Sequence, residues 1–241
     1  MLLGGYQKAK MDRVKGQVDL IYVNNEFYLM ATVDSPEKPP VETDDFLGVD
    51  LGIYNLAVDS SGRKQSGKKV EAVRRTYRKR RASLQNRGTK SAKRRLRKMS
   101  GKERRFKRDI NHQISKKIVE KAKGTRSSIV LEDLKGIRKN VKRLGKTLRS
   151  MIGGWAFDEL RRFIEYKAAL EGIPVIIVPA VNTSRECSVC GYVDKENRKT
   201  QEVFECLHCG HKEHADLNAA KVIRSRALVK KPTVAGDRQV A

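Results

Sequence analysis

Two stretches in the first quarter of the chain alternate apolar and polar residues, which is the period of a β-strand. Between residues 16 and 35 the alternation predicts a β-hairpin, with Asn24 and Asn25 in the turn because asparagine tolerates a positive φ. Residues 47–53 alternate in the same way and predict a strand that holds one acid, Asp50, between two glycines. The glycines allow another backbone, or a ligand, to come close to this carboxylate.

Unbroken apolar runs and apolar residues spaced by three or four predict the later elements. Residues 129–131 and 175–178 predict two short buried strands, the second of them buried on both faces. Isoleucines spaced by four from residue 110 to 118 predict a helix with its apolar side against the core. A further helix is expected over 153–170, with Trp155 in the core, because apolar residues fall on one face there.

The composition favours a basic protein that binds nucleic acid. The chain has 241 residues, 39% of them hydrophobic, a net charge of +25 and a pI of about 10.1. Nucleic-acid-binding domains commonly have a pI above about 9. An anionic membrane surface is the competing partner, but there is no lipidation motif, and the longest apolar run, 173–181, contains two prolines and is too short to span a bilayer. We expect no membrane association and a cytoplasmic protein, nucleoid-associated if it is prokaryotic.

Positive charge is concentrated in one segment. Residues 61–126 hold 27 of the 53 basic residues against four acids, and residues 74–108 hold 18 basic residues and one acid. The segment is expected to be helical, with breaks at Gly88 and Gly101. A solvated basic face is the simplest interpretation, but the shortage of acids favours a polyanion partner contacted mainly at its phosphates. The residues predicted to make these contacts are Arg74, Arg75, Arg78, Lys79, Arg80 and Arg81.

All four cysteines belong to one spaced motif. Cys187-x2-Cys190 and Cys206-x2-Cys209 are separated by fifteen residues, and a glycine follows each pair. This spacing is typical of a zinc site in which two tight turns each present two thiolates to a tetrahedral ion. Two disulfides are the alternative, but they fit poorly with an unsecreted chain of this length. A closed site of four sulfurs is structural rather than catalytic.

Three acids stand at the ends of apolar strands or at a helix start. Asp50 lies in the strand at 47–53, Glu132 ends the strand at 129–131, and Asp216 begins a helix. Taken singly, each has an ordinary interpretation: an acid in a turn, the cap of a following turn, and a helix N-cap. Taken together, three convergent carboxylates can hold two Mg²⁺ ions for an in-line displacement at phosphorus. A basic chain with such a cluster is expected to cut nucleic acid.

These motifs together resemble the TnpB (OrfB) family of transposon-encoded nucleases, which are related to type V CRISPR effectors. The resemblance rests on residues 48–52 (GVDLG), 130–134 (VLEDL) and 215–220 (ADLNAA), with Thr183 and Ser184 ahead of the four-cysteine motif. They are similar to the three RuvC motifs of that family and to the zinc ribbon inserted before the third. The resemblance covers roughly residues 16 to 225.

The resemblance implies both a fold and an activity. The expected fold is α/β, an RNase H-like (RuvC) mixed sheet with flanking helices and an inserted four-cysteine zinc ribbon. The expected activity is DNA cleavage by an endonuclease of an insertion sequence, guided by an RNA from the transposon end. Asp50, Glu132 and Asp216 would hold two catalytic Mg²⁺ or Mn²⁺ ions, and the four cysteines one structural Zn²⁺.

The same resemblance gives expected domain boundaries. In the family a substantial region precedes the first RuvC motif, whereas Asp50 follows only 49 residues here. A truncated copy with impaired activity, a separate product and a wrongly started reading frame are the three expectations. The expected parts are a remnant β domain with its linker (1–43), a RuvC-like core (44–182) with a basic helical insertion (61–126), the zinc ribbon (183–213), the last RuvC motif and its helix (214–228), and a disordered tail (229–241).

Two other functions remain open at this point. One is a nucleic-acid-binding protein of the same family that does not cleave, such as a guided repressor, although all three acids are present. The other is a transposase that joins strands itself, for which the sequence offers no nucleophilic tyrosine or serine module.

Overall fold

A computed structural model of the chain describes residues 3–23, 25–35, 38–134 and 157–229. These residues fall into two compact units, Met1–Pro39 and Pro40–Ala241, and each is described by itself. Some expectations lie outside the described residues: a loop or short helix over 135–149, the core position of Trp155, and the tail from residue 230. No helix in the described part of the chain is long and apolar enough to cross a membrane.

The first unit contains the predicted hairpin. Its elements are α1 (Gly5–Lys8), the short 3-10 helix η1 (Met11–Arg13) and the antiparallel strands β1 (Val14–Val23) and β2 (Glu26–Val33). Val23 pairs with Glu26, and Asn25 has the positive φ (65°) expected of the turn. Large apolar side chains of both strands are exposed, from Ile21 at 38% to Phe27 at 71%, because two strands alone cannot bury either of their faces.

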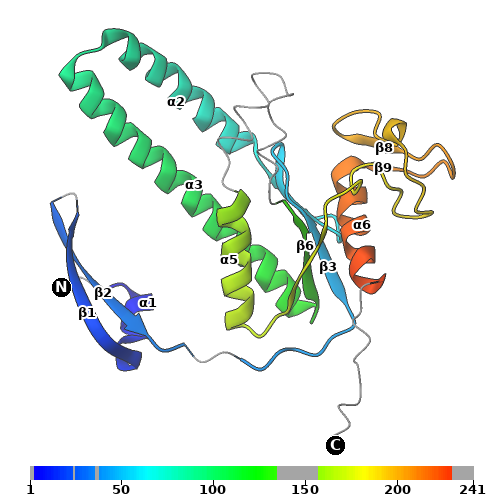
Figure 1. The fold of residues 1–241 in the computed structure, drawn as a ribbon, viewed down its shortest axis with the longest axis horizontal. Coiled ribbons are helices and arrows are strands. Elements are labelled where there is room, and N and C mark those ends of the chain that lie inside the picture. Colours follow the sequence, from blue (N-terminus) through cyan, green and yellow to red (C-terminus); the bar gives the residue numbers. More distant parts are fainter. Residues whose placement is uncertain (1–2, 24, 36–37, 135–156, 230–241) are drawn as a thin grey trace, which may run out of the picture. The chain divides into compact units, whose positions relative to one another are not determined.

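The second unit is built on a mixed five-stranded sheet in the order β5-β4-β3-β6-β7 (Figure 1). The three strands β3, β6 and β7 are parallel, and β4 and β5 extend the sheet in antiparallel pairs. Such a mixed sheet with flanking helices confirms the predicted α/β fold class. The strands are β3 (Phe46–Asp50), β4 (Asn55–Asp59), β5 (Lys64–Ser66), β6 (Ser128–Asp133) and β7 (Val175–Pro179).

Helices cover both faces of this sheet (Figure 1). The alternation along β6 divides its side chains, because Ile129 and Leu131 face one core and Val130 faces the other. The first core is closed by α3 (Lys90–Gly124) and α5 (Phe157–Leu170), and the second by α6 (Ala215–Val229). A residue that follows Leu131 therefore points to the α6 side of the sheet.

The basic segment forms two long antiparallel helices, α2 (Lys68–Arg87) and α3. The predicted break at Gly88 is confirmed, since this glycine ends α2 with a φ of 63° and Thr89 caps α3 by accepting from the Ala92 N–H. The predicted break at Gly101 is wrong, because α3 continues through it. Buried Met99 and Glu103 on either side hold the helix against its neighbours, which outweighs the roughly 1 kcal/mol propensity cost of one glycine.

Three other expectations need adjustment. The segment expected to be wholly helical begins with an edge strand, β5. The strand β7 is not buried on both faces, because it ends the sheet and Val175 to Ile177 are only partly buried. The helix expected over 153–170 is described only from Phe157 onward, where Leu160 and Ile164 are fully buried.

Candidate functional site

Two of the three predicted acids stand side by side on neighbouring strands. Val49 of β3 is paired with Leu131 of β6 in parallel register, so Asp50 and Glu132 are the next residues along each strand. Because Val49 and Leu131 belong to the core under α3 and α5, the two acids point to the opposite, α6 side of the sheet. The acid pair thus lies at the carboxyl ends of parallel strands, where ligands gather in open α/β sheets.

The third acid reaches the same place because α6 lies unusually close to β3. A Cβ atom added at Gly48 would lie 2.2 Å from the carbonyl oxygen of Ala220 and 2.6 Å from the Arg224 nitrogen. Only glycine permits this approach, as the glycines around Asp50 led us to expect. Asp216 is the second residue of α6, so it lies at the N-terminal end of this helix, directly after the zinc-ribbon segment.

The carboxylate of Asp216 does not cap its helix. His214 takes that role, because its Nδ1 accepts a hydrogen bond of 3.2 Å from the Asp216 N–H. The Asp216 carboxylate instead accepts from Asn55 Nδ2 (2.8 Å) and from Arg198 Nη2 (3.3 Å). The sequence analysis missed both partners. Asn55 follows the first motif by only three residues, but nothing in the sequence relates Arg198 to an acid eighteen residues later.

Glu132 is a buried carboxylate that is short of partners. It is 8% exposed, and its Oε1 atom has no hydrogen-bond partner among the described residues. Burial raises the pKa of Glu132, although a hydrogen bond with Thr183 and the charge of Arg226 oppose the shift. Its position inside β6 argues against a simple turn cap. Thr183 belongs to the Thr-Ser pair that precedes the cysteine motif.

Asp50 feels the charges of both other acids. Its pKa is raised well above the ordinary value, first by burial and then by the negative charges of Glu132 and Asp216, while Arg198 acts in the opposite direction. The three carboxylates are therefore neighbours, and together they form a concentration of like charge with a cation nearby. They do not form a tight ligand cluster in the part of the chain that the structure describes, where only the four cysteines have all their ligand atoms within 4.8 Å of one another.

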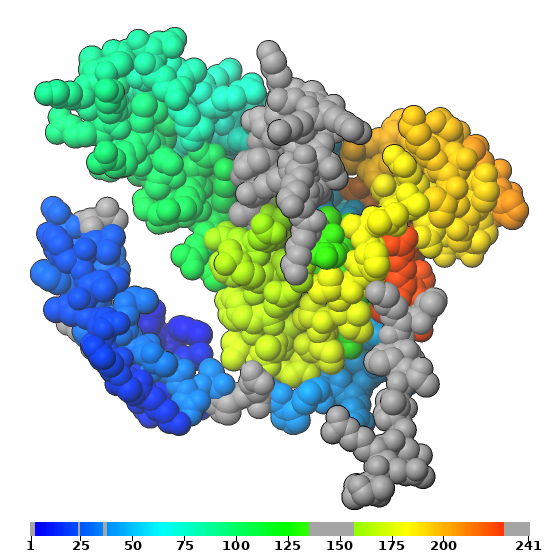
Figure 2. Space-filling view, in the orientation of Figure 1, coloured from blue at the N-terminus to red at the C-terminus, as the bar shows by residue number. Residues whose placement is uncertain are grey.

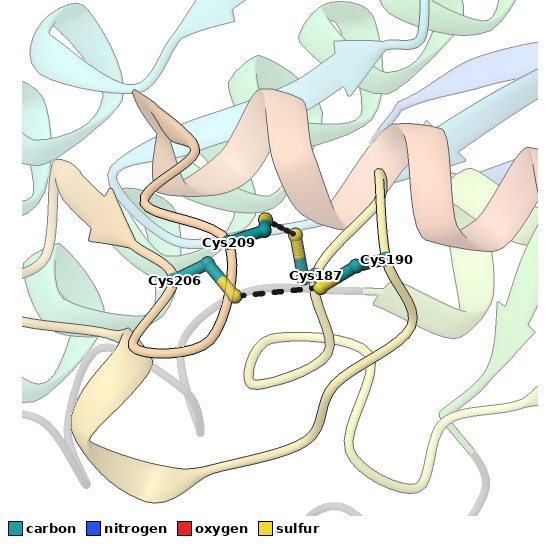
Figure 3. A group of neighbouring side chains, drawn as sticks. All are labelled: Cys187, Cys190, Cys206 and Cys209. Atoms are coloured by element: carbon teal, nitrogen blue, oxygen red, sulfur yellow. Dashed lines mark hydrogen bonds between the residues drawn. The ribbon is translucent and has the colours of Figure 1, made fainter.

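The four cysteines are arranged as a tetrahedral metal site requires (Figure 3). The Sγ atoms of Cys187 and Cys209 are 3.7 Å apart, and those of Cys190 and Cys206 are 3.5 Å apart. A tetrahedral ion with Zn–S bonds of about 2.3 Å places its sulfurs roughly 3.8 Å apart. All four thiols are free, and the sulfur distances far exceed a disulfide bond of about 2.05 Å. The cluster can hold a metal ion.

Each cysteine pair lies in the same kind of turn. The Gly191 N–H donates to the Cys187 carbonyl, and the Gly210 N–H donates to the Cys206 carbonyl, with φ values of 73° and 72° at the glycines. The same turn lowers the pKa of Cys206 to about 7: burial opposes ionisation, but the backbone N–H groups of Cys209 and His208 hydrogen-bond the sulfur. The other turn does not share this effect, because burial raises the pKa of Cys187. At Cys190 the Tyr192 N–H hydrogen-bonds the sulfur, but burial and the neighbouring sulfurs raise the pKa to about 12.

Two buried asparagines fix the ribbon, which also contains η3 (Lys195–Asn197), β8 (Val203–Glu205) and β9 (Lys212–His214). Asn197 donates to the carbonyls of Arg185 and Tyr192 and accepts from the Leu207 N–H, so it joins the two turns. Asn218 of α6 donates to the Glu186 carbonyl and accepts from the Ser188 N–H. The first cysteine turn is thereby tied directly to the helix that carries Asp216, and the second through Asn197.

The six basic residues predicted to contact nucleic acid do not share one environment. Arg74 is 10% exposed and donates twice to Glu71, which also pairs with Arg75. Arg81 pairs with Glu103 of α3 at 2.5 Å. The other three predicted contacts are exposed and form no ion pair with any described residue: Arg78, Lys79 and Arg80.

Comparison with known families agrees with these features. A family model named OrfB_IS605 and described as "Probable transposase" matches residues 28–140, and one described as "Cas12f1-like, TNB domain" matches residues 157–223. The chain is similar to the TnpB (OrfB) family over these two ranges. The second match spans the ribbon and most of α6, and the first includes Asp50 and Glu132.

Individual relatives support the same family. The chain is 34% identical to a CRISPR-associated endodeoxyribonuclease Cas12f1 of Syntrophomonas palmitatica, over 71% of this chain and 37% of the relative. It is 36% identical to the TnpB-like protein MJ0751 of Methanocaldococcus jannaschii, over 47% of this chain and 40% of the relative. The chain thus spans well under two thirds of the length of these curated relatives.

The fold has a close counterpart among solved structures. The Cas12f1 chain of a Cas12f1–sgRNA–target DNA complex matches with a TM-score of 0.64 at 22% identity, over 87% of this chain and 56% of that one. This likeness supports the RuvC-like class of the sheet and its flanking helices.

Proposed function

We propose that this chain is the nuclease part of an RNA-guided DNA endonuclease that hydrolyses phosphodiester bonds with two divalent metal ions. The observation that carries the proposal is the convergence of Asp50, Glu132 and Asp216 at one end of the sheet, on the face covered by α6. The named activity of the Cas12f1 relative supports the substrate, and the solved Cas12f1 complex with sgRNA and target DNA supports the guide.

The residues present fit divalent cations. Carboxylate oxygens are the ligands that Mg²⁺ and Mn²⁺ prefer. The unpartnered Oε1 of Glu132 and the raised pKa of Asp50 indicate an anionic site that a cation would relieve. Asp50, central to the mutual repulsion, would contact both ions, and Glu132 and Asp216 would each complete one coordination shell. Two such ions would stabilise the attacking and leaving oxygens of an in-line displacement.

The protein's own groups position this centre. Asn55 orients one oxygen of Asp216, and Thr183 orients the carboxyl of Glu132. Arg198 donates to the other oxygen of Asp216, where a metal ion would have to displace it. Rigid placement of ligands by a second layer of hydrogen bonds is what metal-dependent enzymes require for precise geometry. The strand β3 and the helix α6 provide this rigidity, because their backbones are in contact at Gly48.

For the cysteine site we propose one structural Zn²⁺ per chain. The sulfur distances and the closed set of four thiolates leave no position for substrate. The ribbon would therefore act on the reaction indirectly, through Thr183, Arg198 and its bonds to Asn218.

The test is cleavage of target DNA with a matching guide RNA and Mg²⁺ or Mn²⁺. Because the chain spans only part of its relatives, it is assayed alone and joined behind the N-terminal region of a longer relative. Asp50→Ala, Glu132→Ala and Asp216→Ala should each reduce cleavage by at least about 1,000-fold, and double variants should be no worse, since the ligands act as a unit. Nucleic-acid binding should survive in all three.

Asp133→Asn is the matched control, because Asp133 follows Glu132 in the same strand but is exposed and pairs with Arg161. It should cleave like the parent. Cleavage that persists in Asp50→Ala would contradict the proposal. Guided binding without cleavage in the parent would favour the alternative function, a guided repressor of the same family.

A further inference from the structure

A groove lies between α2 and α3, near the ends at which the two helices are joined. Figure 2 shows the two helices as the cyan and green lobe that extends from the rest of the second unit. The volume of the groove is about 870 Å³, and no acidic residue lines it among those the structure describes. Six cations do: Lys79, Arg80, Arg87, Arg95, Lys98 and Lys102. All six are exposed, and none forms an ion pair with an acid in the described part of the chain.

The floor of this groove is apolar. Tyr77 and Leu84 from α2 are partly buried, and Met99 from α3 is 9% exposed. An aromatic side chain and two aliphatic ones beneath a rim of positive charge suit the two parts of a polynucleotide, its bases and its phosphates. Grooves that bind single strands combine these features, since cations follow the backbone and aromatic rings stack with bases.

The other charged residues of α2 and α3 have a different role. Glu71 and Glu103 are the acids of α2 and of the facing part of α3, and they take up Arg74, Arg75, Arg81 and Lys107 in ion pairs. The Arg81–Glu103 pair joins the two helices directly. Some cations of α2 and α3 therefore stabilise the helix pair through ion pairs, whereas the six that line the groove are available to bind a ligand.

We propose that this groove binds a single-stranded segment of nucleic acid a few nucleotides long. The phosphates would lie against the six rim cations and one base against Tyr77. A volume of about 870 Å³ lies within the range of about 300–1,000 Å³ that holds one small-molecule ligand, which suits a few nucleotides of one strand. The bases of a duplex are stacked on one another and would not be free to lie against Tyr77. The proposal rests on the proposed function only for a nucleic acid as the partner. RNA and DNA share the phosphodiester chemistry, and the experiment separates them.

The experiment measures binding of the full chain, without added Mg²⁺, to a labelled single-stranded RNA, a DNA strand of the same sequence and the corresponding DNA duplex. The groove variant carries four changes: Lys79→Ala, Arg80→Ala, Lys98→Ala and Lys102→Ala. If all four residues contact phosphates, the slope of log affinity against log salt for single strands should fall by about 3.

A matched variant removes the same charge from exposed residues of α3 outside the groove, with Lys93→Ala, Arg94→Ala, Arg97→Ala and Arg104→Ala. Its slope should change by less than about 1. Tyr77→Leu keeps an apolar floor but removes the ring, so affinity for single strands should fall by about fivefold or more at an unchanged salt slope. The ratio of RNA to DNA affinity then identifies the strand that occupies the groove.

Equal slopes for the two four-site variants would overturn the proposal, because the charge would then act only as a general field. Unchanged affinity of Tyr77→Leu, or tight duplex binding that depends on the same four residues, would also overturn it. Binding requires neither the three acids nor their metals, so Asp50→Ala should bind as the parent does. The binding experiment can therefore be interpreted even if the proposed nuclease function is wrong.

Discussion

The chain contains two sets of candidate metal-ligand residues, and it assembles them in opposite ways. The four cysteines come from two matching turns that Asn197 joins by hydrogen bonds, and sulfurs of different turns lie 3.5 and 3.7 Å apart. The three carboxylates come from β3, β6 and α6, and they remain neighbours although they repel one another. We infer that the ribbon gains stability from its ion, whereas the acid centre is held in place by the rest of the fold at some cost in stability.

The largest expected effect comes from breaking the cysteine site. Cys206→Ala should abolish zinc binding and unfold the ribbon, since structural zinc contributes on the order of 10 kcal/mol to folding small zinc domains. Elemental analysis should find about one zinc per parent chain and none in the variant, and hydrogen exchange should show loss of protection in β8 and β9. Val189→Ala, an exposed change within the first turn, should keep the metal. A Cys206→Ala protein that retains zinc and unchanged stability would contradict the assignment.

Removing an acid should have the opposite effect on stability. Without divalent metal, Asp50→Asn should raise the free energy of unfolding by about 1–2 kcal/mol, because it relieves repulsion at a strained functional site. Denaturant unfolding measures this difference. The matched control is Asp59→Asn, since the buried Asp59 carboxylate accepts hydrogen bonds from Ser61 and Arg63 and should lose stability when changed. Destabilisation by Asp50→Asn would argue against the inference that repulsion among the three acids lowers the stability of the fold.

A third prediction concerns a cation that links the two sites. Arg198 of the ribbon donates a hydrogen bond to Oδ1 of Asp216, so it would compete with a metal ion bound to that oxygen. Arg198→Ala should lower the Mg²⁺ concentration that half-saturates cleavage by about fivefold, which corresponds to roughly 1 kcal/mol for an ion pair of this kind. A magnesium titration of the cleavage rate measures the shift, with zinc content as the check that the ribbon is intact. Arg198→Lys should keep much of the parent's requirement.

The smallest effect concerns a carboxylate whose partners are already in place. Hydrogen bonds from Arg74 lower the pKa of Glu71 to about 2, although burial opposes the shift, and Arg75 adds to it. A lowered folded pKa means that the pair stabilises the fold above the ordinary value of 4.5 and loses that contribution as pH falls toward 2. Glu71→Gln should therefore cost about 1 kcal/mol at pH 7 and nothing near pH 2. Unfolding curves at several pH values would reveal a pH-independent cost if the pair contributes nothing.

Short-range patterns made the cysteine site and most elements predictable. Each cysteine pair lies within one local turn, and the spacing of the two pairs is typical of a zinc site, so the sequence alone predicts that the four sulfurs meet. The strand at Asp50 and the isoleucine face of α3 follow from periodicity for the same reason. The acid centre could not be predicted from any one motif, because a carboxylate at a strand end has several local explanations. Only the combination of three motifs suggested that the three acids meet. Their catalytic role stays a prediction.

Contacts between distant segments were not predictable from one sequence. Arg198 and Asn55 approach Asp216 from the ribbon and from β4, and no periodicity relates them. The basic run gave no hint that Arg74 and Arg81 would pair with acids while Lys79 and Arg80 would face a groove, because that division depends on how α2 packs against α3. Gly101 was expected to break a helix on propensity alone, and packing on both sides overrode it.

The close contact between Gly48 and the backbone of α6 fixes how far Asp216 lies from the two acids on the sheet. Gly48 lies two residues before Asp50, and the backbone of α6 passes directly over it, four residues beyond Asp216. Any larger side chain would push the helix outward and carry Asp216 away from the acids on the sheet. The spacing between two acids that are 166 residues apart in the chain thus depends on the absence of a side chain at Gly48, and the first motif sets this spacing as well as supplying one of the acids.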